Sequence, residues 1–162
     1  MADAGTITGR CLCGAIRYEF HGKPEWVVHC HCESCRRQVS SPLATVVGVL
    51  KENFRFTAGT PKAFASSPGV ARSFCGNCGS PIAYEAVRLP DEIHLCHGTL
   101  DEPGALAPTA HVRTEEQLPW FECTTSCRAT RRAGAAQRRS ATVRNGRNDD
   151  WPALACPPNI AS

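Results

Sequence analysis

The sequence predicts one small, mainly β domain with zinc-binding cysteine knuckles, followed by a tail that has no fold of its own. Three observations carry this prediction. Apolar and polar residues alternate at several places between Thr6 and about His111, as they do in half-buried β-strands. Seven of the eleven cysteines fall in three short clusters within that region. From about Glu122 onward the composition changes to arginine, alanine and small polar residues.

Four strands and one short helix are expected in the first half of the chain. Ile16, Tyr18 and Phe20 alternate with polar residues, and Pro24 separates this strand from the next. A run rich in valine and leucine at 43–50 predicts a strand that is buried on both faces. The expected strands cover residues 16–20, 25–32, 43–50 and 54–56, and the helix begins near Ser34.

A hairpin and two further strands are expected in the second half of the domain. Ser67-Pro-Gly69 has the composition of a tight turn, and the segments on either side of it have strand character. The expected strands of this half cover residues 62–66, 70–74, 81–85 and 92–98.

The chain divides into a zinc-binding domain at 1–123 and an Arg/Ala-rich tail at 124–162. Residues 128–150 contain no aromatic residue and no consistent apolar period, so they cannot offset the entropy of ordering, and we expect the tail to be disordered. The domain has eleven basic and thirteen acidic residues, a balance of −2, whereas the tail has seven arginines and two aspartates, a balance of +5. Nucleic acid is therefore an unlikely partner for the domain, although the tail could contact it. The oligomeric state is not predicted by any of these features.

The cysteines are expected to be reduced. The first residues have neither the basic nor the apolar segment of a secretory signal, and no run of about 20 apolar residues could cross a membrane. An odd number of cysteines would also leave one thiol unpaired in an all-disulfide scheme. We therefore expect a cytoplasmic protein without a membrane partner, whose cysteines are metal ligands or catalytic groups.

Two cysteine pairs that lie far apart in the sequence predict a closed metal site, which we call cluster A. Cluster A is the set Cys11, Cys13, Cys75 and Cys78. One residue separates Cys11 from Cys13, so in an extended segment their thiolates project from the same face. The second pair flanks two residues, which permits a tight turn, and Gly76 and Gly79 can adopt positive φ there. Two distant thiolate pairs form the usual tetrahedral site of a structural zinc ion.

The remaining clustered cysteines predict a second, open site. Cluster B is the set Cys30, Cys32 and Cys35. Three protein sulfurs leave a fourth position for water or a substrate, which is the arrangement of a catalytic zinc ion. The alternative is that a fourth residue closes this site as well. The candidates for that residue are His94, Cys96, His97 and His111. An iron–sulfur cluster is a less favoured alternative, because the spacings do not match the common ferredoxin patterns.

The polar neighbours of cluster B allow two interpretations. His29 and His31 have the opposite strand parity to the cysteines, so they are expected to point away from the metal and to have a packing role. Arg36 and Arg37 could offset the negative charge of a zinc–thiolate centre or hold a substrate carboxylate. They could equally be surface arginines without such a role.

Three segments carry a resemblance to a known family. They are Gly9-Arg-Cys-Leu-Cys-Gly-Ala-Ile-Arg-Tyr18, His29-Cys-His-Cys-Glu-Ser-Cys-Arg-Arg37 and Arg72-Ser-Phe-Cys-Gly-Asn-Cys-Gly-Ser-Pro-Ile82. Gly98-Thr-Leu-Asp101, His111 and Leu118-Pro-Trp120 follow in the expected order. Over about residues 5–121 the sequence resembles the glutathione-dependent formaldehyde-activating enzymes, a family that also includes the centromere protein V-like proteins.

The resemblance implies a β-tent fold of packed antiparallel sheets with two zinc ions per chain, a structural ion at cluster A and another at cluster B. The family name implies the condensation of formaldehyde with glutathione to S-(hydroxymethyl)glutathione, a carbon–sulfur lyase activity. Members usually continue past the Pro-Trp pair with more folded chain, whereas this sequence continues into the Arg/Ala-rich tail.

Two functions are therefore expected as alternatives. The first is a zinc-dependent carbon–sulfur lyase that joins a small electrophile such as formaldehyde to glutathione or a related thiol. His111 or a metal-bound water could move the proton, and no catalytic or cofactor-binding residue is selected by spacing. The second is a non-catalytic zinc module that binds a macromolecular partner. A concave pocket at cluster B would favour the enzyme.

Overall fold

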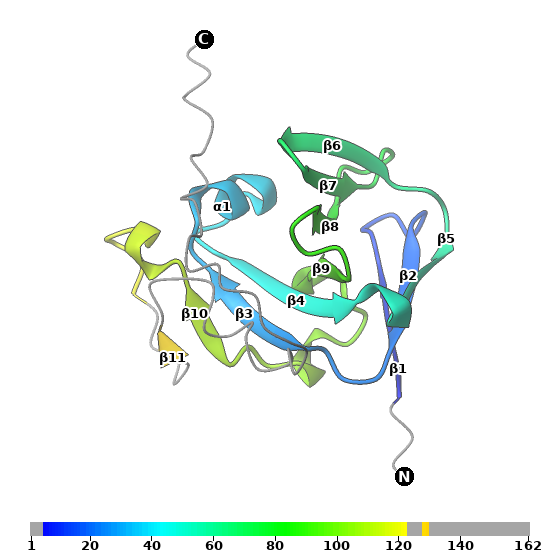
Figure 1. Cartoon of the computed structure of the whole chain (residues 1–162), viewed down its shortest axis with the longest axis horizontal. Helices are drawn as coiled ribbons and strands as arrows, with labels where there is room; N and C mark the ends of the chain where they lie inside the picture. Colours follow the sequence, from blue (N-terminus) through cyan, green and yellow to red (C-terminus); the bar gives the residue numbers. More distant parts are fainter. Residues whose placement is uncertain (1–4, 123–127, 130–162) are drawn as a thin grey trace.

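Two β-sheets and one α-helix make up the part of the chain that the computed structural model describes, residues 5–122 and 128–129 (Figure 1). The smaller sheet is antiparallel, in the order β1 (Thr6–Arg10), β2 (Arg17–His21), β5 (Phe54–Ala58). The larger sheet has the order β11 (Arg128–Ala129), β10 (Ala110–Val112), β3 (Trp26–Cys30), β4 (Ala44–Leu50), β9 (Glu92–Cys96), β8 (Pro81–Ala86), β7 (Val70–Phe74), β6 (Lys62–Ser67). In that sheet β10 runs parallel to β3 and to β11, and the other neighbours are antiparallel.

The helix α1 (Glu33–Val39) follows β3 directly, and the other helical segments are short. Single 3₁₀ turns occur at Lys51–Asn53, His97–Thr99, Pro103–Ala105 and Thr114–Glu116. Among the described residues, none of the helices has the length and apolar composition needed to span a bilayer.

The predicted mainly β fold is confirmed, and most of the predicted elements are present. The strands expected at 16–20, 25–32, 43–50, 54–56, 62–66, 70–74, 81–85 and 92–98 correspond to β2 to β9, and the helix expected near Ser34 is α1. β1 and β10 were not predicted as separate strands. β1 has few apolar residues and so shows no clear alternation, and β10 is only three residues long.

The main core lies between the two sheets. Val27, Val47, Leu95 and Ala83 are cross-strand partners on β3, β4, β9 and β8, so their side chains form one row on the inner face of the larger sheet. All four are buried, in one cluster with Tyr18 and Phe20 of the smaller sheet. Burial of each large apolar side chain contributes about 1.5–3 kcal/mol, so this row is what holds the sheets together.

The outer face of the larger sheet carries a different row. Trp26, Gly48, His94, Tyr84 and Arg72 are successive cross-strand partners on β3, β4, β9, β8 and β7. The rings of Trp26 and His94 meet edge to face at 4.6 Å, and those of His94 and Tyr84 stack at 5.2 Å. The guanidinium carbon of Arg72 lies 5.1 Å from the centre of the Tyr84 ring. This row ends beside α1 and cluster B.

There is no space for a side chain at Gly48, in the middle of this row. A Cβ atom added there would lie 2.1 Å from Cε2 of Trp26, so the indole ring occupies that space. We predict that Gly48→Ala lowers the free energy of unfolding by about 1–3 kcal/mol, because the ring must leave its place against His94.

Thermal denaturation measures this effect, with Gly98→Ala as the control. A Cβ atom at Gly98 has no neighbour within 4 Å, so this variant should stay within about 0.5 kcal/mol of the wild type. Equal melting temperatures for the Gly48 variant and the wild type would contradict the packing described above.

The tail predicted at 124–162 lies outside the described residues except for β11. Arg128 and Ala129 pair with Ala110 and His111 of β10. We propose that residues 1–123 are the folding unit, and we predict that truncation after Cys123 leaves the melting temperature within a few degrees of the full chain. A second truncation after Ala129 keeps β11 and measures the contribution of that pairing. A large loss of stability in both truncations would contradict the proposed boundary.

Candidate metal centres

The four sulfurs of cluster A converge on one point. Their Sγ atoms all lie within 4.8 Å of one another. Cys13 Sγ is 3.5 Å from Cys11 Sγ and 3.8 Å from Cys75 Sγ. A tetrahedral ion with metal–sulfur bonds of about 2.3 Å would hold its sulfurs about 3.8 Å apart, so the set has the spacing of a four-sulfur metal site.

Two turns produce this convergence. Cys11 and Cys13 lie in a turn after β1, closed by a hydrogen bond of 3.0 Å from Gly14 N to the Cys11 carbonyl oxygen. The expectation of an extended segment was therefore wrong there, although the two sulfurs do lie side by side. Cys75 begins the turn between β7 and β8, where Gly79 N donates to the Cys75 carbonyl oxygen at 2.9 Å.

The two glycines of the β7–β8 turn have different roles. Gly79 has a φ of 77°, the left-handed conformation that was expected. Gly76 does not have positive φ, and the prediction for it was wrong. Its missing side chain matters for another reason: a Cβ atom there would lie 2.8 Å from Cε of Lys62, which packs across the turn.

Hydrogen-bond donors surround the sulfurs of cluster A. The N–H of Ile16 donates to Cys11 Sγ at 3.2 Å, and Nδ2 of Asn77 donates to Cys13 Sγ at 3.3 Å. Hydrogen bonds to the side chain and backbone of Ser80 lower the pKa of Cys78 to about 5. Burial raises the pKa of Cys11, but the Ile16 N–H and the neighbouring thiols bring it below its ordinary value. Donors that stabilise thiolates favour a cation at the centre of this set.

The three sulfurs of cluster B also lie within 4.8 Å of one another. Cys30 ends β3 and is buried, whereas Cys32 and Cys35 are half-buried at the start of α1. Contacts with Cys30 and Cys32 hold the pKa of Cys35 well below its ordinary value, and the same contacts raise the pKa of Cys30. The three neighbouring thiols therefore oppose one another's ionisation. A divalent ion would allow all three to ionise.

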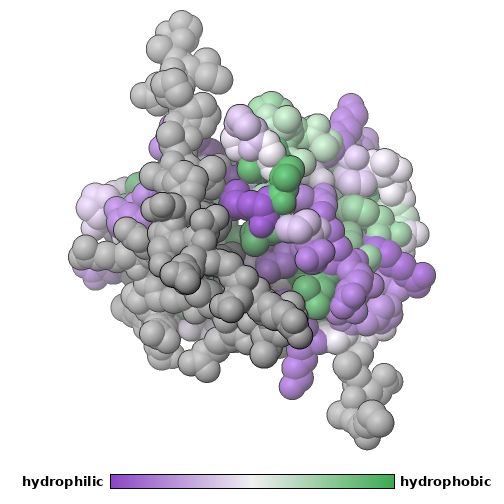
Figure 2. Space-filling model, in the orientation of Figure 1, coloured by the Kyte–Doolittle hydropathy of each residue, from purple (hydrophilic) through white to green (hydrophobic). Residues whose placement is uncertain are grey.

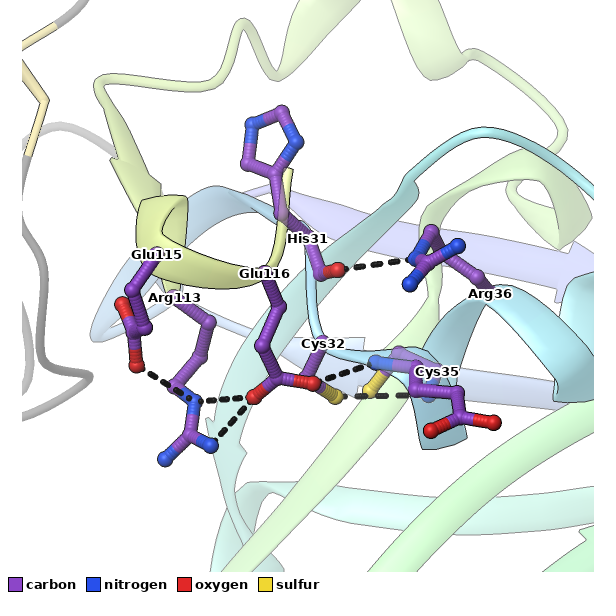
Figure 3. Close-up of polar contacts among 8 residues, drawn as sticks. His31, Cys32, Cys35, Arg36, Arg113, Glu115 and Glu116 are labelled. Carbon is purple, nitrogen blue, oxygen red and sulfur yellow. Dashed lines mark hydrogen bonds and ion pairs between the residues drawn. The ribbon is translucent and has the colours of Figure 1, made fainter. Parts of the chain in front are cut away.

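The start of α1 fixes the positions of two of these cysteines. Cys32 is the N-cap residue, and its Sγ accepts a hydrogen bond of 3.3 Å from the N–H of Cys35. The backbone N–H of Glu33, in the same first turn of α1, donates to the carboxylate of Glu116 at 2.8 Å. Arg113 in turn forms ion pairs with Glu115 and Glu116, so the segment after β10 anchors the helix (Figure 3).

The histidines next to cluster B point away from it, as predicted. His29 bonds Thr45 through Nδ1 at 2.9 Å, and a hydrogen bond of 2.8 Å joins Nε2 of His31 to Nδ1 of His111. In Figure 3 the His31 ring lies on the other side of the backbone from Cys32 and Cys35. Burial lowers the pKa of all three histidines, that of His29 to about 4, so these imidazoles are neutral at pH 7.

None of the four residues proposed to close cluster B joins its sulfurs within 4.8 Å, among the residues that the structure describes. His111 and His97 have other partners, His31 and the Leu106 carbonyl oxygen. His94 bonds Glu92 at 3.1 Å, and its ring lies against those of Trp26 and Tyr84.

Cys96 is a candidate on which the charge of cluster B acts. It pairs with Val46, which packs against the buried cluster that includes Cys30. Burial and the charge of Cys35 raise the pKa of Cys96 to about 12, so without a metal its thiol remains protonated.

The arginines of α1 have partners of their own. Arg37 forms an ion pair with Glu33 at 2.7 Å, and Nε of Arg36 donates to the His31 carbonyl oxygen at 3.0 Å. Arg72 of β7 is instead the cation that acts on Cys35, whose pKa it lowers after the larger effects of Cys30 and Cys32. Sequence reasoning did not select Arg72, although it opens the third segment that carries the family resemblance.

A hollow of about 320 Å³ lies at the opposite end of β4 from cluster B. It is lined by Leu50, Lys51, Glu52, Pro90 and Asp91. Ala44, at the other end of β4, is the residue that pairs with Cys30. This hollow is therefore not a concave pocket at cluster B of the kind that would favour the enzyme.

Comparisons with known proteins place the chain in one family. The family described as glutathione-dependent formaldehyde-activating enzyme matches residues 6–116. A Schizosaccharomyces pombe protein named as an uncharacterized lyase is 34% identical over 76 residues, which are 47% of this chain and 55% of that protein. The chain thus spans about half the length of this relative. A crystal structure of a Rhodobacter sphaeroides protein has 20% identity and a TM-score of 0.48, covering 58% of this chain and 87% of the other.

Replacement of a cysteine tests the assignment of cluster A as a structural metal site. Cys78→Ser removes one of the four sulfurs of cluster A, whose ion would contribute about 10–16 kcal/mol, as much as the whole stability of a domain. We predict that this variant is insoluble or largely unfolded. Metal analysis and circular dichroism measure the outcome, and a folded variant with unchanged metal content would refute the assignment.

Cys96→Ser is the matched control, since it replaces a half-buried cysteine outside both clusters. It should retain the fold and the full metal content. If the Cys96→Ser variant bound one metal ion fewer than the wild type, Cys96 would be the fourth ligand of cluster B.

Proposed function

The chain belongs to the family of glutathione-dependent formaldehyde-activating enzymes, and we propose that it is a zinc-dependent lyase that forms a carbon–sulfur bond between glutathione, or a related thiol, and a small aldehyde such as formaldehyde. The single observation that carries this proposal is the difference between the clusters. Cluster A has four sulfurs, whereas cluster B has three half-buried or buried ones and no fourth His, Cys, Asp or Glu in its group among the described residues.

Both clusters have donor sets that fit zinc. Sulfur ligands at tetrahedral spacing are typical of Zn²⁺. We propose that cluster A holds a structural ion and that Cys30, Cys32 and Cys35 hold the second ion. Bound zinc lowers the pKa of a thiol at its open position and so favours the nucleophilic thiolate.

The residues of cluster B are suited to receiving a small thiol. Cys32 and Cys35 are half-buried, so a thiol can approach from solvent without a change in the sheet. The N-cap bond from Cys35 N to Cys32 Sγ and the anchor from Glu116 to Glu33 N keep the first turn of α1 in one conformation. A preorganised set of sulfurs loses little entropy when a ligand binds.

Addition of the thiolate sulfur to the aldehyde carbon forms the carbon–sulfur bond and leaves an alkoxide, which takes one proton to become the hydroxyl. His111 was expected as one source of that proton. It pairs with His29 across β10 and β3, whereas Cys30 pairs with Val112, so His111 lies on the opposite side of the sheet from cluster B. We propose that solvent supplies the proton.

A cobalt-substituted protein tests the open position. We predict that glutathione changes the sulfur-to-cobalt charge-transfer bands, because a new sulfur ligand joins the metal at cluster B. The same protein in its zinc form should form the adduct of glutathione and formaldehyde faster than the uncatalysed reaction. Cys35→Ser should lose both effects, while Cys96→Ser should keep them.

A different set of results would favour a non-catalytic module. If cobalt spectra indicate four protein ligands at both clusters and no thiol alters them, cluster B is closed. The chain would then be a metal-binding module for a macromolecular partner.

A further inference from the structure

We propose that Arg72 is the positioning residue of cluster B: it fastens α1, and with it Cys35, to the larger sheet and offsets the negative charge of the three sulfurs. This inference rests on the proposed function only in requiring a metal ion at cluster B. It concerns a residue on β7, a strand that contributes no ligand to that cluster.

The hydrogen bonds of Arg72 link the sheet to the helix. Its Nη2 donates to Ser34 Oγ at 2.7 Å, and its Nη1 donates to Oε1 of Gln38. Both acceptors belong to α1 and lie on either side of Cys35 in the sequence. Its Nε donates to Ser66 Oγ of β6 at 3.2 Å, which fixes the planar guanidinium against the hairpin. Hydrophilic and hydrophobic side chains lie side by side where α1 meets this hairpin (Figure 2).

The Tyr84 ring packs against the guanidinium of Arg72. Arg72 lies over the Tyr84 ring at 5.1 Å, and Tyr84 stacks on His94. A cation over an aromatic face is stabilised by the ring quadrupole, and the planar group of arginine suits this geometry better than a lysine ammonium does. The position of Arg72 is therefore determined by the sheet as well as by α1.

The partners of Arg72 leave its charge available to cluster B. Its acceptors on Ser34, Gln38 and Ser66 are neutral hydroxyl or amide oxygens, and among the described residues no carboxylate forms an ion pair with it. Three thiolates around one divalent ion carry a net charge of −1. A half-buried cation next to Cys35, with no carboxylate paired to it among the described residues, can balance that charge.

Arginine has two properties here that substitutions can separate. Arg72→Lys keeps the charge and loses the planar donors, whereas Arg72→Met loses both. Ser34→Ala removes one acceptor on α1 and leaves the charge intact. Arg55→Met is the matched control, because Arg55 pairs with Glu19 on the smaller sheet and its side chain is 70% exposed.

The experiment is a cobalt titration of the metal-free full-length chain, followed by absorption spectroscopy. Arg72→Met should weaken binding of the second cobalt equivalent about 10- to 100-fold and shift its charge-transfer band, while the first equivalent binds as in the wild type. Arg72→Lys and Ser34→Ala should give smaller losses. The double variant with Arg72→Met and Ser34→Ala should be no weaker than Arg72→Met alone, because Ser34 acts through Arg72. Arg55→Met should match the wild type.

Three results would overturn the inference. One is an unchanged second equivalent in Arg72→Met. Another is an equal loss of both equivalents, which would make Arg72 a general stabilising residue. The third is unchanged cobalt binding with a raised KM for carboxylate-bearing thiols only, which would make it a substrate-binding residue. If the wild type binds two cobalt ions but ignores glutathione, the proposed function fails while the Arg72 series still decides this inference.

Discussion

The convergence of four cysteine sulfurs is the constraint on which the rest of the structure depends. Cluster A brings the turn after β1, in the smaller sheet, against the turn between β7 and β8, in the larger one. Cys11 and Cys75 are each about 1% exposed and belong to the same buried cluster as Tyr18 and Phe20. The sulfurs are thus continuous with the apolar core. Thiolates at this spacing repel one another, so a cation at their centre and the burial of the core stabilise the same arrangement.

Cluster B is constructed in a different way, because its sulfurs belong to one short segment. Cys30 is fixed by β3, but Cys32 and Cys35 depend on the position of a seven-residue helix. A helix of this length is not stable by itself, so its position must come from tertiary contacts. Glu116 supplies one such contact at the first turn, and Arg72 supplies others from the sheet. These contacts keep the geometry of the cluster defined, which the proposed exchangeable metal position would require.

The larger sheet separates two kinds of chemistry. On one side of β3 lie three histidines that are packed together and neutral, and on the other lies the thiol cluster. Strand parity places His29 and Cys30 on opposite faces of β3, and α1 then keeps Cys32 and Cys35 with Cys30. His29, His31 and His111 therefore contribute packing and hydrogen bonds to the attachment of β10, which runs parallel to β3 and lies next to it.

The sequence by itself determined the mainly β class, most strands, and the division of seven cysteines into clusters A and B, because alternation and cysteine spacing are local signals. It also determined that His29 and His31 face away from cluster B, since parity follows directly from position in a strand. The tertiary structure alone decided that Cys11 and Cys13 meet in a turn rather than on a strand and that His111 lies across the sheet from the thiols. It also decided that Arg72, rather than Arg36 or Arg37, is the arginine that lowers the pKa of Cys35. The physical reason is that these relations depend on which strands are neighbours. Cross-strand partners such as Arg72, Tyr84 and His94 are distant in the chain and carry no local pattern that marks them as adjacent.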